Sequence, residues 1–242
     1  MKILAIESST SLGGVSLLVD NEISQSRSSK RQKSHSDIIH LYIEEIFQQE
    51  KISYTDIDYL AVGIGPGSFT GIRVAVNTAK TFSYVLNKPI VVVDSLESLA
   101  YQALLKFPEL KYEKSITVMM NAYKNMVYFG QFNLENQIPK YVKSAQAIPV
   151  KHLHTYLGEE LHIVVGDGYT TYQTYIEKNL PNRIRHLSEM EQYPHPDTIA
   201  LLANLKLKNN AETYDWKSFT PLYLRASEAE ENKQGILLIP LS

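Results

Sequence analysis

The stretch that decides the fold reads Gly63-Ile64-Gly65-Pro66-Gly67-Ser68-Phe69-Thr70-Gly71-Ile72-Arg73. It holds four of the chain's eleven glycines, and it joins a strand-like run at residues 59–62 to a helical pattern at residues 69–86. Glycine tolerates positive φ and allows another backbone to come close. The unpaired N–H groups at the start of the helix also make such a turn a ready anion site. The stretch therefore predicts a strand, a tight turn and a helix, and it raises the hypothesis of a phosphate loop.

The established phosphate-binding motifs do not fit this stretch. A Walker loop, G-x-x-x-x-G-K-[ST], needs a lysine that reaches the terminal phosphates. Five residues after Gly63 or Gly65 the chain has Ser68 or Thr70, and no lysine follows. The dinucleotide fingerprint G-x-G-x-x-G fails at the same positions, and Pro66 removes one backbone donor. Close packing of the following helix is the favoured interpretation, with a partner contact and direct nucleotide binding as alternatives.

Length and composition limit the class of protein. A chain of 242 residues suits one large domain or two small ones. Its hydrophobic content of 44% and net charge of −2 are those of a globular protein without a broad basic face for nucleic acid. The absence of cysteine excludes disulfides and thiolate metal sites. The apolar start reaches Glu7 too early for a signal peptide, and no apolar run has membrane-spanning length, so we expect a cytoplasmic protein with no membrane partner.

The predicted elements occur twice in the same order. In the first half we expect strands at 3–6, 15–19 and 22–29, a helix at 36–50, a strand at 59–62, a helix at 69–86, a strand at 90–93 and a helix at 95–105. In the second half we expect strands at 115–120, 126–132 and 139–147, a helix at 150–157, a strand at 161–165, a helix at 168–178, a strand at 183–187 and a helix at 196–208. This pattern predicts an α/β fold of two similar subdomains, 1–107 and 108–218, with a tail at 219–242 that packs on the first.

The two helices of the first half are more apolar than helices with a single buried face. A second stripe on the later helix, through Val74, Thr78, Thr81 and Val85, is also less polar than solvent would require. Such helices are buried on two sides, one of which is the sheet; the other is either internal core or a second subunit. The principal stripes supply the candidate partner interface: Ile39, Ile43, Ile46, Ile72, Ala75, Val76, Ala79 and Phe82.

Patterns for catalysis and for metal binding are weak. His35 and His40 are five residues apart, which separates them by about 140° on a helix, so they do not share one face as a metal pair would. No G-x-S-x-G elbow occurs. We therefore expect no catalytic residue and no metal site. Four carboxylates stand at element ends, where caps and turns are the commoner role: Glu7, Asp94, Asp167 and Asp197.

With these residues in hand, the chain closely resembles the bacterial TsaB (YeaZ) family. Five motifs carry the resemblance: Ile3-Leu4-Ala5-Ile6-Glu7-Ser8-Ser9-Thr10, Gly65-Pro66-Gly67-Ser68-Phe69-Thr70-Gly71-Ile72-Arg73, Val93-Asp94-Ser95-Leu96-Glu97-Ser98-Leu99-Ala100, Pro221-Leu222-Tyr223-Leu224-Arg225, and His35-Ser36 at the first helix. The second motif is the most specific, and its signature residues are Gly65, Pro66, Gly67, Ser68, Phe69, Thr70, Gly71 and Arg73. The resemblance is strong over residues 1–105, thin through the second half, and returns near the C-terminus.

The resemblance implies an actin-like, Hsp70-like ATPase (ASKHA) fold of two ribonuclease-H-like subdomains with mixed five-stranded sheets. It implies a non-catalytic subunit that forms a heterodimer with TsaD for threonylcarbamoylation of adenosine 37 in ANN-decoding tRNAs. TsaE is the implied third component, a homodimer is expected when the chain is alone, and tRNA is contacted indirectly through the complex. No cofactor is expected on this chain, because ATP and metal belong to TsaD. The M22 glycoprotease label often given to the family finds no support in the residues.

Two departures from the family pattern bear on catalysis. The first strand ends in Glu7 where the family commonly has aspartate, and the second half has Asn121-Ala122-Tyr123 where Asp-Ala-Arg is frequent. Actin-like ATPases need a carboxylate near each phosphate hairpin to organise Mg²⁺. His35 and His40 also do not reproduce the TsaD metal pair, whose histidines are four apart. These departures argue against ATP turnover; an active actin-like ATP-binding enzyme and an M22-type metallopeptidase stay as the alternatives.

Overall fold

A computed structural model of the chain describes four stretches, residues 1–30, 36–113, 115–135 and 138–226. It divides the chain into two units. The first unit combines residues 1–98 with 194–222, and the second combines residues 99–193 with 223–226 of the described chain. Each unit is built on one five-stranded sheet. Among the described residues, none of the helices is long and apolar enough to cross a membrane.

The sheet of the first unit has the strand order β3-β2-β1-β4-β5. Its strands are β1 (Lys2–Glu7), β2 (Leu12–Val19), β3 (Glu22–Lys30), β4 (Tyr59–Gly63) and β5 (Ile90–Val93). β1, β4 and β5 run parallel, whereas β2 is antiparallel to both β1 and β3. The parallel strands are apolar on both faces because helices cover both faces of the sheet.

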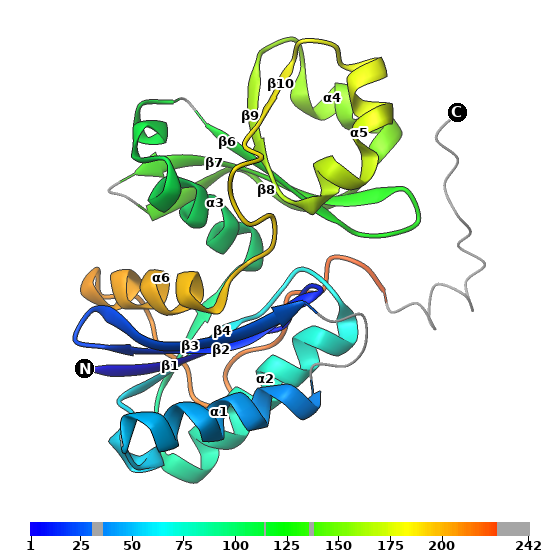
Figure 1. The fold of residues 1–242 in the computed structure, drawn as a ribbon. Helices are drawn as coiled ribbons and strands as arrows, with labels where there is room; N and C mark the ends of the chain where they lie inside the picture. Colours follow the sequence, from blue (N-terminus) through cyan, green and yellow to red (C-terminus); the bar gives the residue numbers. More distant parts are fainter. Residues whose placement is uncertain (31–35, 114, 136–137, 227–242) are drawn as a thin grey trace. The chain divides into compact units, whose positions relative to one another are not determined.

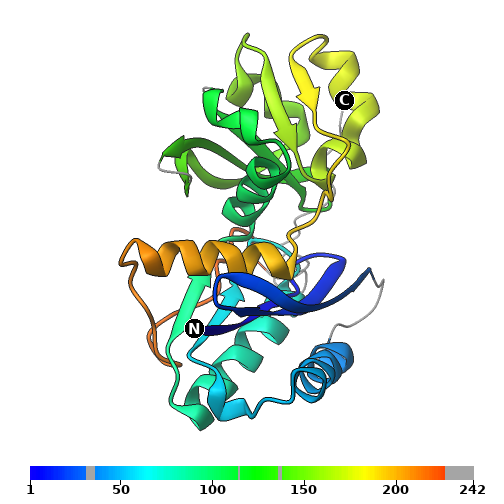
Figure 2. The same ribbon diagram turned by 60° about the vertical axis from the view of Figure 1, so that its left-hand side comes forward.

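Three helices cover this sheet: α1 (Ser36–Glu50), α2 (Phe69–Leu86) and α6 (Pro196–Lys208). Figures 1 and 2 show α1 and α2 side by side on one face and α6 across the opposite face. α6 contacts all five strands. A short 3₁₀ turn, η1 (Tyr54–Asp56), leads from α1 towards β4. The core beneath α1 and α2 includes Leu4, Ile6, Val15, Leu17, Leu60 and Val62 from the sheet and Phe47 from α1.

The limits of α2 follow from its sequence. Ser68 is the N-cap, and its hydroxyl accepts a hydrogen bond from the Gly71 N–H at 3.3 Å. The helix ends at Asn87, which adopts the left-handed conformation with φ of 52°. These two caps fix both ends of the helix that follows the glycine stretch, as the sequence predicts.

The second unit repeats this plan with the strand order β10-β9-β6-β7-β8. Its strands are β6 (Ile116–Asn121), β7 (Met126–Glu135), β8 (Ile138–Pro149), β9 (His162–Val165) and β10 (Ile184–His186). Its helices are α3 (Ser95–Lys106), whose first residues belong to the first unit, α4 (Leu153–Leu157) and α5 (Asp167–Asn179), with the 3₁₀ turns η2 (Pro108–Tyr112) and η3 (Val150–His152). One core cluster joins the sheet to α4 and α5 through Met119, Phe129, Leu153 and Ile176.

The order and type of the predicted elements are confirmed, and so are the two mixed five-stranded sheets. The unit boundaries differ from the predicted 1–107 and 108–218. The reason lies in two helices: most of α3 belongs to the second unit, whereas α6, the last helix, packs across the sheet of the first. Hydrophobic periodicity shows that a helix is buried, but it does not show which sheet the helix covers.

The start of the C-terminal tail lies on the first unit. Tyr214 and Ile90 exchange backbone hydrogen bonds of 2.7 and 2.8 Å, and Phe219 enters the core. The Lys80 ammonium donates to the Phe219 carbonyl at 2.8 Å, and the Leu222 N–H donates to the Ile64 carbonyl at 2.8 Å. Of the predicted tail, residues 219–222 thus lie on the first unit as expected, residues 223–226 belong to the second unit, and residues 227–242 lie outside the described residues.

An ion pair between Lys206 and Glu97 joins α6 to the start of α3. The Lys206 Nζ lies 2.6 Å from the Glu97 Oε2, and both side chains are mostly buried. Lys206→Met leaves the Glu97 carboxylate without this partner in a poorly solvated place, so we expect the free energy of unfolding to fall by about 3 kcal/mol. Lys208→Met, at an exposed position of the same helix, is the matched control and should change it by less than about 0.5 kcal/mol. Equal urea midpoints for the two variants would contradict this prediction.

Candidate functional site

The glycine stretch packs backbone to backbone against the turn that follows β1. A Cβ added at Gly67 would lie 2.1 Å from the Ser9 carbonyl oxygen, and one added at Gly71 would lie 2.0 Å from the Ser8 carbonyl oxygen. The Ser68 N–H donates to that Ser9 oxygen at 2.7 Å. Only glycine allows this approach at both positions. The favoured interpretation, close packing of the following helix, is confirmed.

Gly65 is enclosed in the same way. It has φ of +100°, and a Cβ there would lie 2.6 Å from Ile72 and 2.9 Å from the Leu222 carbonyl oxygen. Its own carbonyl accepts a hydrogen bond from the Ser95 N–H at 2.8 Å. In open α/β sheets, ligands bind beyond the carboxyl ends of the parallel strands. At this edge of the first unit the chain's own backbone occupies that place.

The signature residues of the glycine stretch differ in how far they are exposed to solvent. Gly65, Pro66 and Gly71 are buried, and Gly67 and Phe69 are half-buried. Ser68, Thr70 and Arg73 are exposed, and the Arg73 guanidinium lies 3.9 Å from the centre of the Phe69 ring. The N–H groups of Ser68, Gly71 and Ile72 all donate within the protein. Helix capping and turn packing therefore use donors that a phosphate would need.

Glu7 lies fully buried between three segments. Its Oε1 accepts a hydrogen bond of 2.5 Å from the Ser9 N–H, and its Oε2 accepts one of 3.4 Å from the Ser95 hydroxyl. A Cβ at Gly63 would lie 1.9 Å from that Oε2. Burial raises the pKa of Glu7, and the hydrogen bonds from Ser9 and Ser95 oppose this effect only in part. A carboxyl group enclosed in this way fits a structural role better than Mg²⁺ coordination, which requires the ionised form.

In the second unit, the turn after β9 also brings glycines into close contact with another backbone segment. A Cβ at Gly166 would lie 2.2 Å from the Met119 carbonyl oxygen, and one at Gly168 would lie 2.8 Å from it. The Gly166 N–H, at the start of α5, donates to the side-chain oxygen of Gln192 at 2.8 Å. Gln192 in turn donates to the carbonyls of Leu187 and Met190. The role of Gln192 was not predicted, because a lone glutamine in a loop carries no sequence signal for capping.

Asp167 is the perturbed carboxyl group of this second turn. Its Oδ1 accepts a hydrogen bond of 2.9 Å from the Asn121 N–H. Burial raises the pKa of Asp167 from 3.8 to about 6, although hydrogen bonds from the backbone N–H groups of Asn121 and Asp167 itself lower it in part. Asp94, another of the four predicted end-of-element carboxylates, caps α3: its Oδ1 accepts hydrogen bonds from the N–H groups of Leu96 and Glu97 at 2.7 and 3.1 Å.

The predicted interface residues lie in the core. Seven of them are at most 2% exposed and face the sheet: Ile39, Ile43, Ile46, Ile72, Ala75, Val76 and Ala79. Phe82 is half-buried and its ring packs edge-on against Tyr54 at 5.7 Å. The stripes therefore identify the inward face of α1 and α2, because periodicity is strongest on the side that packs against the sheet. The outward face of the same helices exposes apolar residues that this set omits, Leu41 and Val85.

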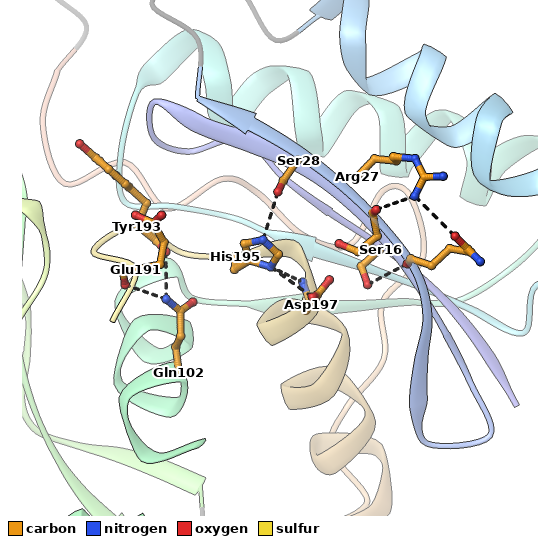
Figure 3. Close-up of polar contacts among 10 residues, drawn as sticks. Ser16, Arg27, Ser28, Gln102, Glu191, Tyr193, His195 and Asp197 are labelled. Atoms are coloured by element: carbon orange, nitrogen blue, oxygen red, sulfur yellow. Dashed lines mark hydrogen bonds and ion pairs between the residues drawn. The ribbon is translucent and has the colours of Figure 1, made fainter. Parts of the chain in front are cut away.

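A row of Ser28, His195 and Asp197 has the composition of a catalytic triad (Figure 3). The Ser28 hydroxyl lies 3.1 Å from His195 Nε2, and the Asp197 carboxylate lies 3.4 Å from Nδ1. The Asp197 N–H, however, donates a hydrogen bond of 3.3 Å to the same Nδ1, because His195 is the N-cap residue of α6. In the neutral tautomer that accepts this hydrogen bond at Nδ1, the proton of His195 lies on Nε2 and is donated to Ser28, so this tautomer is no base for the hydroxyl. His195 therefore caps α6, and its hydrogen bond with Ser28 connects this helix to β3.

Metal ligands do not gather within the described residues. No group of three or more His, Cys, Asp or Glu side chains there could hold a metal ion. His40 is exposed on α1. His35, the histidine with which the sequence analysis compares it, lies outside the described residues.

The pKa of Asp167 has a consequence for stability. Because the folded value of about 6 exceeds the ordinary value of 3.8, the wild type loses stability as the pH rises from about 4 to 6 and keeps this penalty above it. Asp167→Asn retains an acceptor for Asn121 and removes the charge, so it should stabilise the fold by up to about 3 kcal/mol at pH 7.5. Thermal melts at pH 4 and pH 7.5 measure this. The gain should vanish at pH 4, and a gain of equal size at both values would contradict the assignment.

The family of the chain emerges from comparison with known proteins. A family model described as "TsaD: tRNA N6-adenosine threonylcarbamoyltransferase" matches residues 22–233. The chain is similar to the "tRNA threonylcarbamoyladenosine biosynthesis protein TsaB" of Bacillus subtilis (strain 168), with 28% identity over 232 residues, or 95% of this chain and 96% of that protein.

Solved structures show the same fold. "YeaZ from Pseudomonas aeruginosa" superposes with a TM-score of 0.79 at 21% identity, over 92% of this chain and 99% of that chain. An inorganic polyphosphate/ATP-glucomannokinase from Arthrobacter sp. strain KM gives a TM-score of 0.51 at 10% identity, over 86% and 99%. The predicted actin-like ATPase (ASKHA) fold is confirmed. Because the family model matches most of the chain, the chain belongs to the family that the TsaD model describes, and its likeness to the Bacillus subtilis protein over nearly the full length of both makes it a member of the TsaB (YeaZ) group.

Proposed function

We propose that this chain is a non-catalytic subunit in the biosynthesis of threonylcarbamoyladenosine. It pairs with a TsaD-type catalytic chain for modification of adenosine 37 in ANN-decoding tRNAs. The names of the family model and of the Bacillus subtilis relative support the pathway. The proposal includes a homodimer in the absence of the partner, TsaE as a further component, a cytoplasmic location, and no cofactor on this chain.

One observation carries the non-catalytic assignment: the enclosed edge of the first sheet. Gly67 and Gly71 pack against the carbonyl oxygens of Ser9 and Ser8, so these turns present acceptors where a phosphate needs donors. The Glu7 carboxyl group, which accepts a hydrogen bond from the Ser9 N–H, is buried and has a raised pKa. In the second unit, Gln192 occupies the N–H group of Gly166 at the start of α5. An ATPase of this fold needs donors and ionised carboxylates at these places.

The outward face of α1 and α2 is the proposed contact with the partner. Leu41 is 49% exposed and Val85 is 69% exposed, and Thr81 lies one helical turn from Val85 on the exposed side. Exposed apolar side chains on neighbouring helices are typical of a helix-to-helix interface. A stable contact would bury about 800 Å² on each partner.

If the outward face of α1 and α2 contacts the partner, a single charge introduced there should prevent association. Val85→Asp should abolish co-purification with the TsaD-type partner, because a buried unpaired carboxylate opposes association. The same variant should fail to support tRNA modification in a reconstituted reaction, while its melting temperature stays close to that of the wild type. Val142→Asp, at a 54% exposed position in β8, is the matched control and should co-purify normally. Normal co-purification of Val85→Asp would exclude this face. A charge at the buried Ala79 is unsuitable here, because it would disrupt the core.

The enclosed strand ends predict that the isolated chain binds no nucleotide. Isothermal titration with Mg-ATP should show no binding heat, with the TsaD-type partner in the same buffer as the positive control. The physical reason is that the N–H groups of Ser68 and Gly71 are already hydrogen-bonded inside the protein. A dissociation constant below about 100 μM would instead favour the alternative of an active ATP-binding enzyme.

A further inference from the structure

The turn between β6 and β7 has an unusual backbone. Three consecutive residues adopt the left-handed conformation: Tyr123 with φ of 57°, Lys124 with φ of 51° and Asn125 with φ of 58°. This conformation is unfavourable for residues with a Cβ, and runs of it are rare outside glycine. Such strained segments persist only where the surrounding structure holds them, and they concentrate at functional sites.

Side chains from distant parts of the second unit hold this turn. The Arg225 guanidinium donates to the carbonyls of Ala122 and Tyr123. The Asn121 side chain accepts hydrogen bonds from the Tyr123 N–H at 2.9 Å and from the Tyr172 hydroxyl at 3.3 Å. Arg225 ends the late Pro221-Leu222-Tyr223-Leu224-Arg225 motif, whose role the proposed function does not explain.

The turn displays an aromatic ring in basic surroundings. Tyr123 is 69% exposed, and Lys124 follows it directly. The Asn125 carbonyl accepts a hydrogen bond of 2.9 Å from the Val150 N–H, so the segment that follows Val150 lies beside the turn. That segment contributes Lys151 and the exposed rings of His152 and His154. Neither residues 122–130 nor residues 150–158 contain an acidic side chain.

We propose that the Tyr123-Lys124-Asn125 turn, with Lys151, is a contact for a single-stranded RNA loop. In this contact a base stacks on the Tyr123 ring and the lysine ammonium groups bind phosphates. Aromatic stacking combined with basic groups is how proteins bind unpaired nucleotides, whereas a protein interface core tends to exclude lysine. The strained backbone keeps the ring pointing outward before the RNA arrives, which lowers the entropic cost of binding. The proposal rests on the proposed function, since that function brings a tRNA to the complex.

The test uses the complex of the full chain with its TsaD-type partner. Tyr123→Ala with Lys124→Ala should raise the dissociation constant for tRNA about tenfold in fluorescence anisotropy at fixed salt. The slope of log Kd against log salt should fall by about 0.7, because one phosphate contact of a single strand is lost. Lys111→Ala with Tyr112→Ala removes an equivalent pair elsewhere, where Lys111 lies over the 82% exposed Tyr112 ring, and should leave the affinity unchanged.

A second variant separates preorganisation from the side chains. Asn125→Gly keeps Tyr123 and Lys124 but relieves the left-handed strain, so it should raise the melting temperature and weaken tRNA binding several-fold.

Each outcome of these measurements decides a different question. Failure of the wild-type chain to co-purify with the partner contradicts the proposed function. If the turn variant co-purifies but binds tRNA as the wild type does, the RNA contact is wrong. The same conclusion follows if the control pair loses affinity equally. If the turn variant alone loses the partner, the turn is a protein contact and not an RNA contact.

Discussion

The close contact between the glycine stretch and the turn after β1 is the constraint on which the first unit depends. Because Gly67 and Gly71 have no Cβ, the start of α2 lies directly on the carbonyls of Ser9 and Ser8. This contact sets the position of α2 on the sheet, and with it the core beneath that helix. The contact lies at the edge of the sheet where related α/β folds bind ligands.

The second unit repeats this close glycine contact. Gly166 and Gly168 approach the carbonyl of Met119 in the second unit as Gly67 and Gly71 approach their partners in the first. In both units an acidic side chain is enclosed beside the turn, Glu7 in one and Asp167 in the other, and burial raises both pKa values. In both units, the turns at the carboxyl ends of the parallel strands are therefore packed closely against neighbouring backbone. This favours a subunit that acts through its surfaces.

Helical periodicity predicted the buried faces well and the exposed ones poorly. Ile39, Ile43 and Ala79 recur at helical spacing because they face the sheet, so the strongest sequence signal marks the core. On α2 the exposed face was marked only by the weaker second stripe that contains Val85, and Leu41 on α1 was not among the candidate interface residues. The strained turn at Tyr123 was equally invisible, because Tyr-Lys-Asn is not a sequence typical of left-handed backbone.

The order and type of the elements and the duplicated α/β plan were determined by the amino-acid sequence alone, because local hydrophobic periodicity, caps and glycine turns act over a few residues. The glycine stretch also sufficed to argue against a Walker loop. Only the tertiary structure decided that α6 covers the first sheet, that Gln192 caps α5, and that Arg225 holds the turn of Tyr123. These contacts join residues separated by 26 to more than 100 positions. No local pattern encodes such a pairing, since it depends on how the whole chain packs.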